Sequence, residues 1–188
     1  MQGSIGEEIL NLYETALQQT IPDFTLDLPV SNSLLTIDEL LIINNIALAE
    51  YQYMGNHEKA IERLYFIKDY MERKPIDPIE KPKLYTAIIA NLTSWEEDEG
   101  HYDRELSLAE QGLAFCFTYG VQNSFDHLLC SKGTALSYLG RKEEGVKFLS
   151  QALAVMVAKN HSDIALYCAE QLKKVFDYDF KDLLEKIM

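Results

Sequence analysis

Residues 51–61 read YQYMGNHEKAI, and this stretch has two counterparts further along the chain, EEDEGHYDREL at 96–106 and LSYLGRKEEGV at 136–146. In each, a helix end is followed by a glycine, a short polar turn and the start of a second helix. The three glycines lie 45 and 40 residues apart. Self-similarity at such a period is typical of a solenoid of helical hairpins, because one hairpin cannot bury its own apolar face and must stack on another.

The rest of the chain carries a helical pattern. Between the prolines, apolar residues recur at spacings of three and four, as in Leu40, Ile43 and Ala47, and this spacing marks one face of a helix. The sequence has no run of alternating apolar and polar residues next to Asn-Gly or Asp-Gly, the pattern that indicates a β-hairpin. We therefore expect an all-α fold, a right-handed superhelix of stacked antiparallel helix pairs. Thr36 is expected to cap one helix, with Glu39 completing a capping box.

About nine helices are expected, and we assign them to one domain. A chain of 188 residues is long enough for a single domain with its own core. We take residues 1–4 as an artificial-looking start and residues 5–188 as one repeat domain. Its helix pairs are predicted at about 37–73, 81–119, 122–159 and 162–187. The single helices are predicted at 5–20, 37–54, 57–73, 81–99, 102–119, 122–139, 142–159, 162–176 and 180–187.

The charge of the chain excludes several kinds of partner. Thirty acidic and 17 basic side chains give a formal charge of −13. A broad nucleic-acid surface needs a basic face, and an anionic membrane would repel this chain. No apolar run approaches the ~20 residues of a membrane span, and no signal peptide is recognisable. Three cysteines without a C-x-x-C pair favour the reducing cytoplasm.

No catalytic constellation is recognisable in the sequence. It has no Gly-rich phosphate loop, no G-x-S-x-G and no H-E-x-x-H motif. His57 and His101 follow turn glycines and are expected at the surface, and none of the four histidines has the spacing of metal ligands. The acidic run at 96–99 is interpreted as a solvated face, with binding of a basic partner as the alternative. We predict no enzymatic activity, no metal and no cofactor.

The turn pattern resembles a tetratricopeptide repeat, in which a Tyr lies nine residues before the Ala of an A-x3-F pair. Tyr51 and Ala60 have this spacing, with Leu64 in the Phe position. The third unit carries Gly133 at the small position where two helices pack closely. The second unit departs from the pattern, with Glu105 in the Ala position. The period is longer than the usual 34 residues, and the Trp and Pro positions are not kept.

Several runs are similar to the C-terminal regulatory region of helix-turn-helix (XRE-type) transcriptional regulators of Gram-positive bacteria, a group related to peptide-pheromone sensors. The runs are TIDELLIINNIA at 36–47, NLTSW at 91–95, EQGLAFC at 110–116 and KG at 132–133. The similarity covers most of 5–176. It implies a ligand-sensing and dimerising region that binds a short peptide in a concave groove. DNA contact would then come from an upstream helix-turn-helix domain, which we do not find ahead of residue 36.

The candidate ligand-binding residues are the polar residues at the inner positions of the first helix of each pair. In the similar regulators, asparagines at such positions hold the backbone amides of a ligand, and a side-chain amide offers both a donor and an acceptor. The candidates are Asn45, Gln52, Asn91, Ser94, Thr134 and Tyr138, with His127 and Ser131 in the same register. The alternative is that Asn44, Asn45 and Asn91 only satisfy neighbouring groups of their own helices.

The first helix and the overall role each leave two interpretations open. The predicted helix 5–20 has a wide apolar face for a terminal element. Either it docks on the next hairpin with part of that face exposed, or it is the second helix of a hairpin whose first helix was cut away.

The resemblance favours a regulator that dimerises. The rival function is a free-standing tetratricopeptide scaffold that binds the tail of a partner protein.

Overall fold

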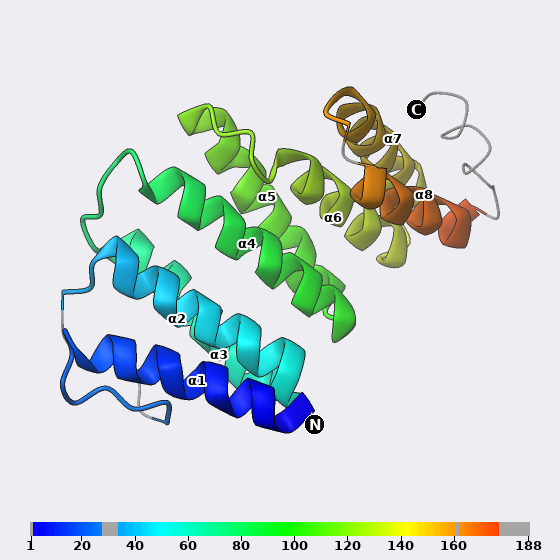
Figure 1. The fold of residues 1–188 in the computed structure, drawn as a ribbon. Helices are drawn as coiled ribbons and strands as arrows, with labels where there is room; N and C mark the ends of the chain where they lie inside the picture. The colour runs from blue at the N-terminus through cyan, green and yellow to red at the C-terminus, as the bar shows by residue number, and fades with distance from the viewer. Residues whose placement is uncertain (1, 28–33, 161, 177–188) are drawn as a thin grey trace. The chain divides into compact units, whose positions relative to one another are not determined.

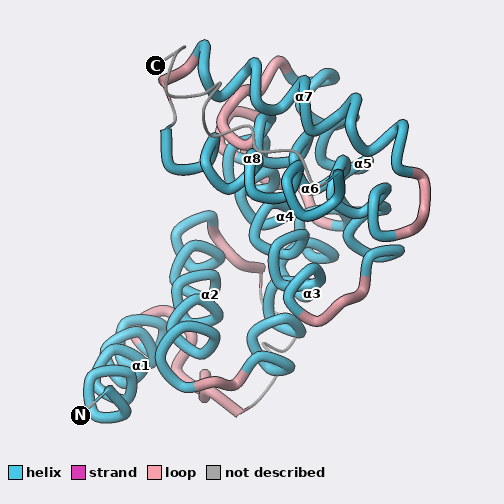
Figure 2. Tube along the Cα trace, turned by 90° about the vertical axis from the view of Figure 1, so that its right-hand side faces the viewer, coloured by secondary structure: helices cyan, strands magenta, loops and turns pink. Residues whose placement is uncertain are grey.

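The computed structural model describes residues 2–27, 34–160 and 162–176, and these residues form helices joined by turns (Figure 1). The described part contains no strand, as the colouring in Figure 2 also shows. The predicted all-α fold is therefore confirmed. In chain order the elements are α1 (Gln2–Gln18), α2 (Ile37–Ala49), η1 (Glu50–Met54), α3 (His57–Arg73), α4 (Lys81–Asp98), α5 (Tyr102–Tyr119), α6 (Phe125–Tyr138), α7 (Lys142–Ala158) and α8 (Ser162–Phe176).

The observed helix ends lie close to the predicted ones. The helix expected at 122–139 begins later, at Phe125, because residues 122–124 belong to the preceding turn. The helix expected at 180–187 lies outside the described residues. None of the helices that the structure describes combines the length and the apolar character needed to cross a membrane.

The contacts of the chain group into two compact units, divided between Ile88 and Ile89 inside α4. In the first unit, α1 packs on α2 and η1, and α2 packs on α3. The side chains at its centre are almost fully buried: Leu17, Leu40, Ile43, Ile46, Leu64, Ile67 and Met71. The capping box at the start of α2 is confirmed, since Glu39 N donates to Thr36 Oγ1 at 3.3 Å and Thr36 N donates to Glu39 Oε2 at 2.7 Å.

In the second unit, α6 packs between α5 and α7, and α8 packs on α7 and α6. The close approach predicted at Gly133 is confirmed. A Cβ atom on Gly133 would lie 2.8 Å from the backbone N of Leu149 and 2.9 Å from the backbone O of Gly145. Both atoms belong to α7, so the absence of a side chain at Gly133 lets the backbones of α6 and α7 touch.

The predicted continuous helix 37–54 is wrong in its last five residues, which form the π-helical turn η1. A π-turn accommodates one extra residue in a helix. Glu50 lies five residues before Gly55, whereas Glu96 lies four residues before Gly100. Both carboxylates are buried, and each contacts a basic side chain from the helix that follows or from the turn itself. Arg63 Nε lies 2.6 Å from Glu50 Oε2, and His101 Nδ1 lies 2.8 Å from Glu96 Oε2.

Candidate functional site

Polar side chains join α4 to α6 in the second unit. The Oγ of Ser94 lies 3.0 Å from Nε2 of His127, and Ser131 donates a hydrogen bond to Thr93 Oγ1 at 3.1 Å. Burial lowers the pKa of the His127 imidazole, against the opposing influence of Asp126 and the backbone of Ala90. The ring is therefore neutral at pH 7. Of these groups, Ser94 and His127 are only half-buried, so they remain partly accessible.

The predicted residues on α4 and α6 do not all reach the surface. Asn91 and Ser94 lie one helical turn apart on α4, and both are half-buried. Tyr138 is 46% exposed and stacks on Tyr102, with 4.3 Å between ring centroids. Thr134 is completely buried, and its hydroxyl has no hydrogen-bond partner among the described residues. The placement of Thr134 on an accessible surface is thus corrected: α6 is enclosed by α5, α7 and α8 there.

The two candidates of the first unit lie on either side of the start of the π-turn. Asn45 is half-buried on α2, and Gln52 is exposed within η1. Counted back from the buried carboxylates, Asn45 lies five residues before Glu50, and Asn91 lies five residues before Glu96. Counted back from the turn glycines, Asn45 lies ten residues before Gly55 and Asn91 lies nine residues before Gly100. The extra residue of η1 accounts for this difference. They occupy equivalent positions in two successive repeats.

The acidic run at 96–99 is only partly the solvated face that we predicted. Glu96 is fully buried against His101, and Arg104 Nη1 lies 3.7 Å from the same carboxylate. Glu97 is half-buried and accepts a hydrogen bond from the hydroxyl of Tyr167 on α8, whose oxygen lies 2.7 Å from each oxygen of the carboxylate. Burial raises the pKa of the Glu97 carboxyl, although Tyr167 acts in the opposite direction. Only the last two residues of the run are exposed.

Glu105 is a buried acid that our reading of the sequence did not single out as a titrating group. It lies on α5, is completely buried, and neither carboxylate oxygen has a hydrogen-bond partner among the described residues. Burial and the nearby Glu97 raise the pKa of Glu105 to about 10. A signal was present in the sequence, because the residues five positions after the other two turn glycines are Ala60 and Gly145, both buried. Glu105 thus occupies a position at which the other two repeats have a small apolar residue.

The three cysteines lie inside the protein. Cys116, Cys130 and Cys168 are free and buried. Burial raises the pKa of Cys116, and contact with Cys168 together with burial raises that of Cys130, so both thiols stay protonated at neutral pH. The described residues contain no group of three His, Cys, Asp or Glu side chains arranged to hold a metal ion.

The fold is similar to solved structures of the repeats of a kinesin light chain-like protein from Podosopora anserina, which are described as nearly identical TPR-like repeats. One of them, a form with a single substitution, superposes with a TM-score of 0.62 at 17% identity, covering 99% of this chain and 84% of that one. A second structure gives 0.60 at 18% identity, covering 99% and 85%. The predicted tetratricopeptide-like solenoid fold is confirmed. No protein-family model matches the chain, and no curated protein matches it.

Proposed function

We propose that this chain is a protein-interaction module that binds a short peptide or an extended segment of a partner protein. The observation that carries the proposal is the equivalence of Asn45 and Asn91, two half-buried amides at the same position of successive repeats. An extended peptide presents a donor and an acceptor at each residue, and an asparagine amide can satisfy both. Ser94 and His127 add hydrogen-bonding groups, and the exposed ring of Tyr138 adds an aromatic face.

Replacing either asparagine by alanine is expected to weaken peptide binding and to leave the helical content unchanged. Each lost amide leaves peptide groups unpaired in a partly desolvated site, which costs about 1–3 kcal/mol. Peptides are selected on the parent chain from a displayed random library. Their affinities for Asn45→Ala and Asn91→Ala are then measured by calorimetry, with circular dichroism as the folding check.

The matched control for this experiment is Asn123→Ala, which removes an exposed amide from the turn between α5 and α6. The control should bind as the parent does. If Asn45→Ala and Asn91→Ala fold normally and bind as tightly as the control, the recognition surface lies elsewhere. If both unfold at a lower temperature than the parent, the asparagines serve their own helices, which is the structural alternative.

The resemblance of residues 36–47, 91–95 and 110–116 to helix-turn-helix regulators supports a finer proposal. In it, the module is the ligand-sensing and dimerising region of a transcription regulator in the cytoplasm. A separate helix-turn-helix domain would contact DNA, and two copies would pair to match a two-fold operator. A helix-turn-helix encoded directly upstream would support this role, whereas a partner-binding scaffold needs none.

The chain alone is expected not to bind duplex DNA specifically. Its formal charge of −13 opposes the phosphate backbone, which dominates the affinity of DNA-binding proteins. A gel-shift experiment at moderate salt checks this with random-sequence duplexes and any operator taken from the gene's own upstream region. A sequence-specific complex that weakens as salt is added would contradict the expectation and would assign DNA contact to this chain itself.

A further inference from the structure

The second unit encloses polar groups that no other described residue satisfies. Glu105 on α5 and Thr134 on α6 are completely buried, and neither the two Glu105 carboxylate oxygens nor the Thr134 hydroxyl has a hydrogen-bond partner among the described residues. Buried polar groups of folded proteins nearly always have a partner, and each exception calls for an explanation. A ligand that supplies the missing partner is one such explanation, and the surroundings of Glu105 decide its chemistry.

Thr134 and Glu105 belong to one cluster with Glu97, the half-buried acid near the end of α4. Thr134 lies one helical turn after Cys130, so the two share a face of α6. Contact with Cys168 and burial raise the pKa of Cys130, and the charges of the two acids raise it further. This face of α6 is therefore turned towards both carboxylates, and the Thr134 hydroxyl lies on it.

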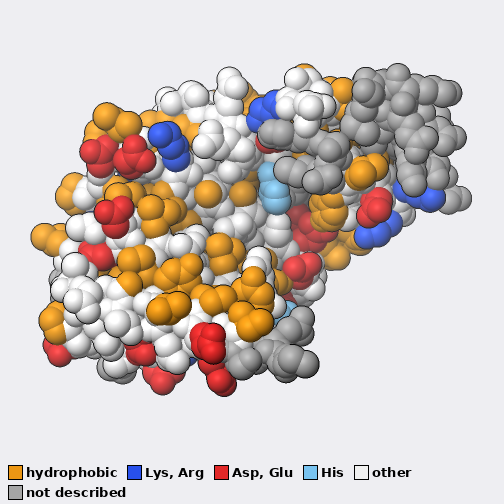
Figure 3. Space-filling view, in the orientation of Figure 1, with side chains coloured by type: hydrophobic (Ala, Val, Ile, Leu, Met, Phe, Trp, Pro, Cys, Tyr) orange, Lys and Arg blue, Asp and Glu red, His pale blue; other side chains and the backbone are white. Residues whose placement is uncertain are grey.

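Tyrosines from three helices border the two carboxylates. The Tyr167 hydroxyl of α8 donates to Glu97, and Tyr167 is 38% exposed. The ring of Tyr102, at the start of α5, stacks on the exposed Tyr138 at the end of α6. Burial raises the pKa of Tyr102, and its stacking partner and both acids add to the rise, so the stacked rings lie near the acids. Figure 3 shows acidic side chains gathered on this face, where the end of α4 lies beside α6.

Two other buried glutamates show what Glu105 lacks. Glu50 contacts Arg63, and Glu96 contacts His101. Glu105 has no such basic contact in the described part of the chain, and burial together with Glu97 raises its pKa to about 10. The carboxyl therefore holds its proton at pH 7. A cation from outside the chain would do for Glu105 what the two basic side chains do for the other buried glutamates.

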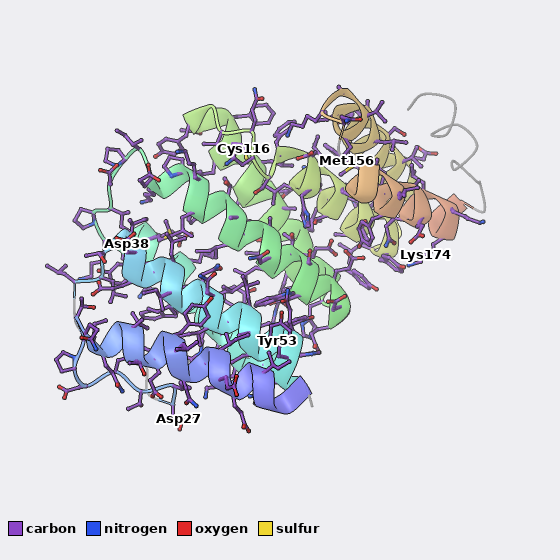
Figure 4. All side chains as sticks on the ribbon, in the orientation of Figure 1. Asp27, Asp38, Tyr53, Cys116, Met156 and Lys174 are labelled. Carbon is purple, nitrogen blue, oxygen red and sulfur yellow. The ribbon has the colours of Figure 1, made fainter. Side chains whose placement is uncertain are left out.

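The charge around the two carboxylates is negative. Asp98 acts on Glu97 in the same direction as burial does, and Lys174 acts against them. Lys174 is exposed near the end of α8, where Figure 4 labels it. A further cation is therefore attracted to this place. The titratable or charged groups near the two carboxylates are, in chain order, Asp98, Tyr102, Cys130, Tyr138, Tyr167 and Lys174.

The cluster adjoins the surface proposed for the partner segment. Asn91, Ser94 and Glu97 follow one another at a spacing of three on α4, and residues three apart are neighbours on a helix surface. Between positions 91 and 97, these three are the residues that are not buried. A segment held by Asn91 and Ser94 can therefore place one of its side chains against Glu97.

We propose that Glu97, Glu105 and the tyrosines around them form a site for the cationic end of a lysine or arginine side chain of the partner segment. The inference rests on the proposed function and specifies the chemistry of the partner. The ammonium or guanidinium donates to the half-buried carboxylate of Glu97 and lies against the exposed ring of Tyr138, since the faces of aromatic rings attract cations. We call this the acidic site: Glu97, Tyr102, Glu105, Thr134, Tyr138 and Tyr167.

Binding also displaces a proton. The positive charge favours the ionised form of Glu105, so the O–H bond of its carboxyl breaks and the proton passes to the buffer. The affinity for a basic side chain should therefore rise from pH 7 to pH 9, below the pKa of about 10 that Glu105 has in the free protein. Glu105→Gln has no proton to release there, and its affinity should vary much less with pH.

The test titrates two blocked pentapeptides into the full chain and follows the backbone amide signals by NMR. They are Gly-Gly-Arg-Gly-Gly and its analogue with the uncharged citrulline in place of arginine. The arginine peptide should bind at least ~10-fold more tightly, the expected value of one charge-assisted contact. Glu97→Gln should remove this preference, and it should fold like the parent by circular dichroism because its amide oxygen can still accept from Tyr167. The control Glu143→Gln, at an exposed position on α7, should keep the preference.

Each outcome separates the acidic site from the proposed function. If the parent does not prefer the arginine peptide, or if Glu97→Gln keeps the preference, the acidic site is overturned, while library peptides bound through Asn45 and Asn91 still support the interaction module. If the preference is present but equal at pH 7 and pH 9, the role of Glu105 is overturned and Glu97 binds the cation without it. If neither the pentapeptides nor any library peptide binds, the acidic site and the proposed function both fall.

Discussion

Glu105→Gln should stabilise the protein by about 3 kcal/mol at pH 7. The carboxyl has an ordinary pKa of 4.5 when the chain is unfolded and about 10 in the folded state, where burial and Glu97 oppose its ionisation. Between these two values the folded state binds a proton that the unfolded state has released, so stability falls as pH rises. Each pH unit costs about 1.4 kcal/mol, and about 2.5 units separate the unfolded pKa from neutrality. The glutamine is uncharged at every pH and avoids this cost.

Urea unfolding at several pH values measures this effect. The parent should lose stability steadily from pH 5 towards pH 9 relative to Glu105→Gln, and the two curves should converge near pH 4. Glu143→Gln, at an exposed position on α7, is the matched control and should change the free energy of unfolding by less than about 0.5 kcal/mol. Parallel pH profiles for parent and Glu105→Gln would contradict the buried, unpartnered carboxyl.

Gly133→Leu should destabilise the second unit by about 3 kcal/mol, at the upper end of the usual cost of overpacking. Even the Cβ atom would press on the backbone N of Leu149 and the backbone O of Gly145, and backbone atoms of a packed helix cannot step aside as the end of a side chain can. The remaining leucine atoms must then separate α6 from α7. At the usual 2–4 °C for each kcal/mol in a chain of this size, the melting temperature should fall by roughly 6–12 °C.

Gly112 provides the comparison for this prediction. The three atoms nearest to a Cβ atom there are all side-chain methyl groups rather than backbone atoms, from Leu128 at 2.8 Å and 2.9 Å and from Ile89 at 2.9 Å. Gly112→Ala should therefore cost clearly less than Gly133→Ala, measured by thermal unfolding in the same buffer. Equal melting temperatures for the two alanine variants would mean that α6 and α7 do not touch at Gly133.

The helix framework could be predicted because its signals are local. Turn glycines, the capping box at Thr36 and the three-and-four apolar spacing each act within a few residues, and the predicted ranges 57–73, 102–119 and 162–176 coincide with α3, α5 and α8. The π-turn was not predicted, because nothing in the five residues Glu50–Met54 distinguishes a π-helical turn from an ordinary α-helical one. The sequence carries one trace of it: Asn45 and Asn91 differ by one residue in their distance from the following turn glycine.

The candidate surface was less predictable, because exposure depends on which helices enclose a residue. Helical spacing placed Ser94 and His127 in related registers, and the structure brings them within hydrogen-bonding distance. The same spacing placed Thr134 with them, but the neighbouring helices of the second unit bury it completely. Glu96 and Glu105 show the converse: charge suggests solvent, yet packing encloses both carboxylates. Sequence periodicity gives the face of a helix and not the depth at which that face lies.

The π-turn lets the first repeat contain one more residue than the second while its buried ion pair is kept. An inserted residue in a regular helix would rotate everything beyond it by about 100°, but η1 absorbs the extra residue and keeps Glu50 bonded to Arg63. The bulge is also where α1 rests: a Cβ atom on Gly6 would lie 3.0 Å from Cβ of Tyr53, which Figure 4 labels. Removing one residue from η1 would regularise the helix and turn Tyr53 away from this seat. A deletion within η1 would therefore change the length of this helix and the contact with α1 at the same time.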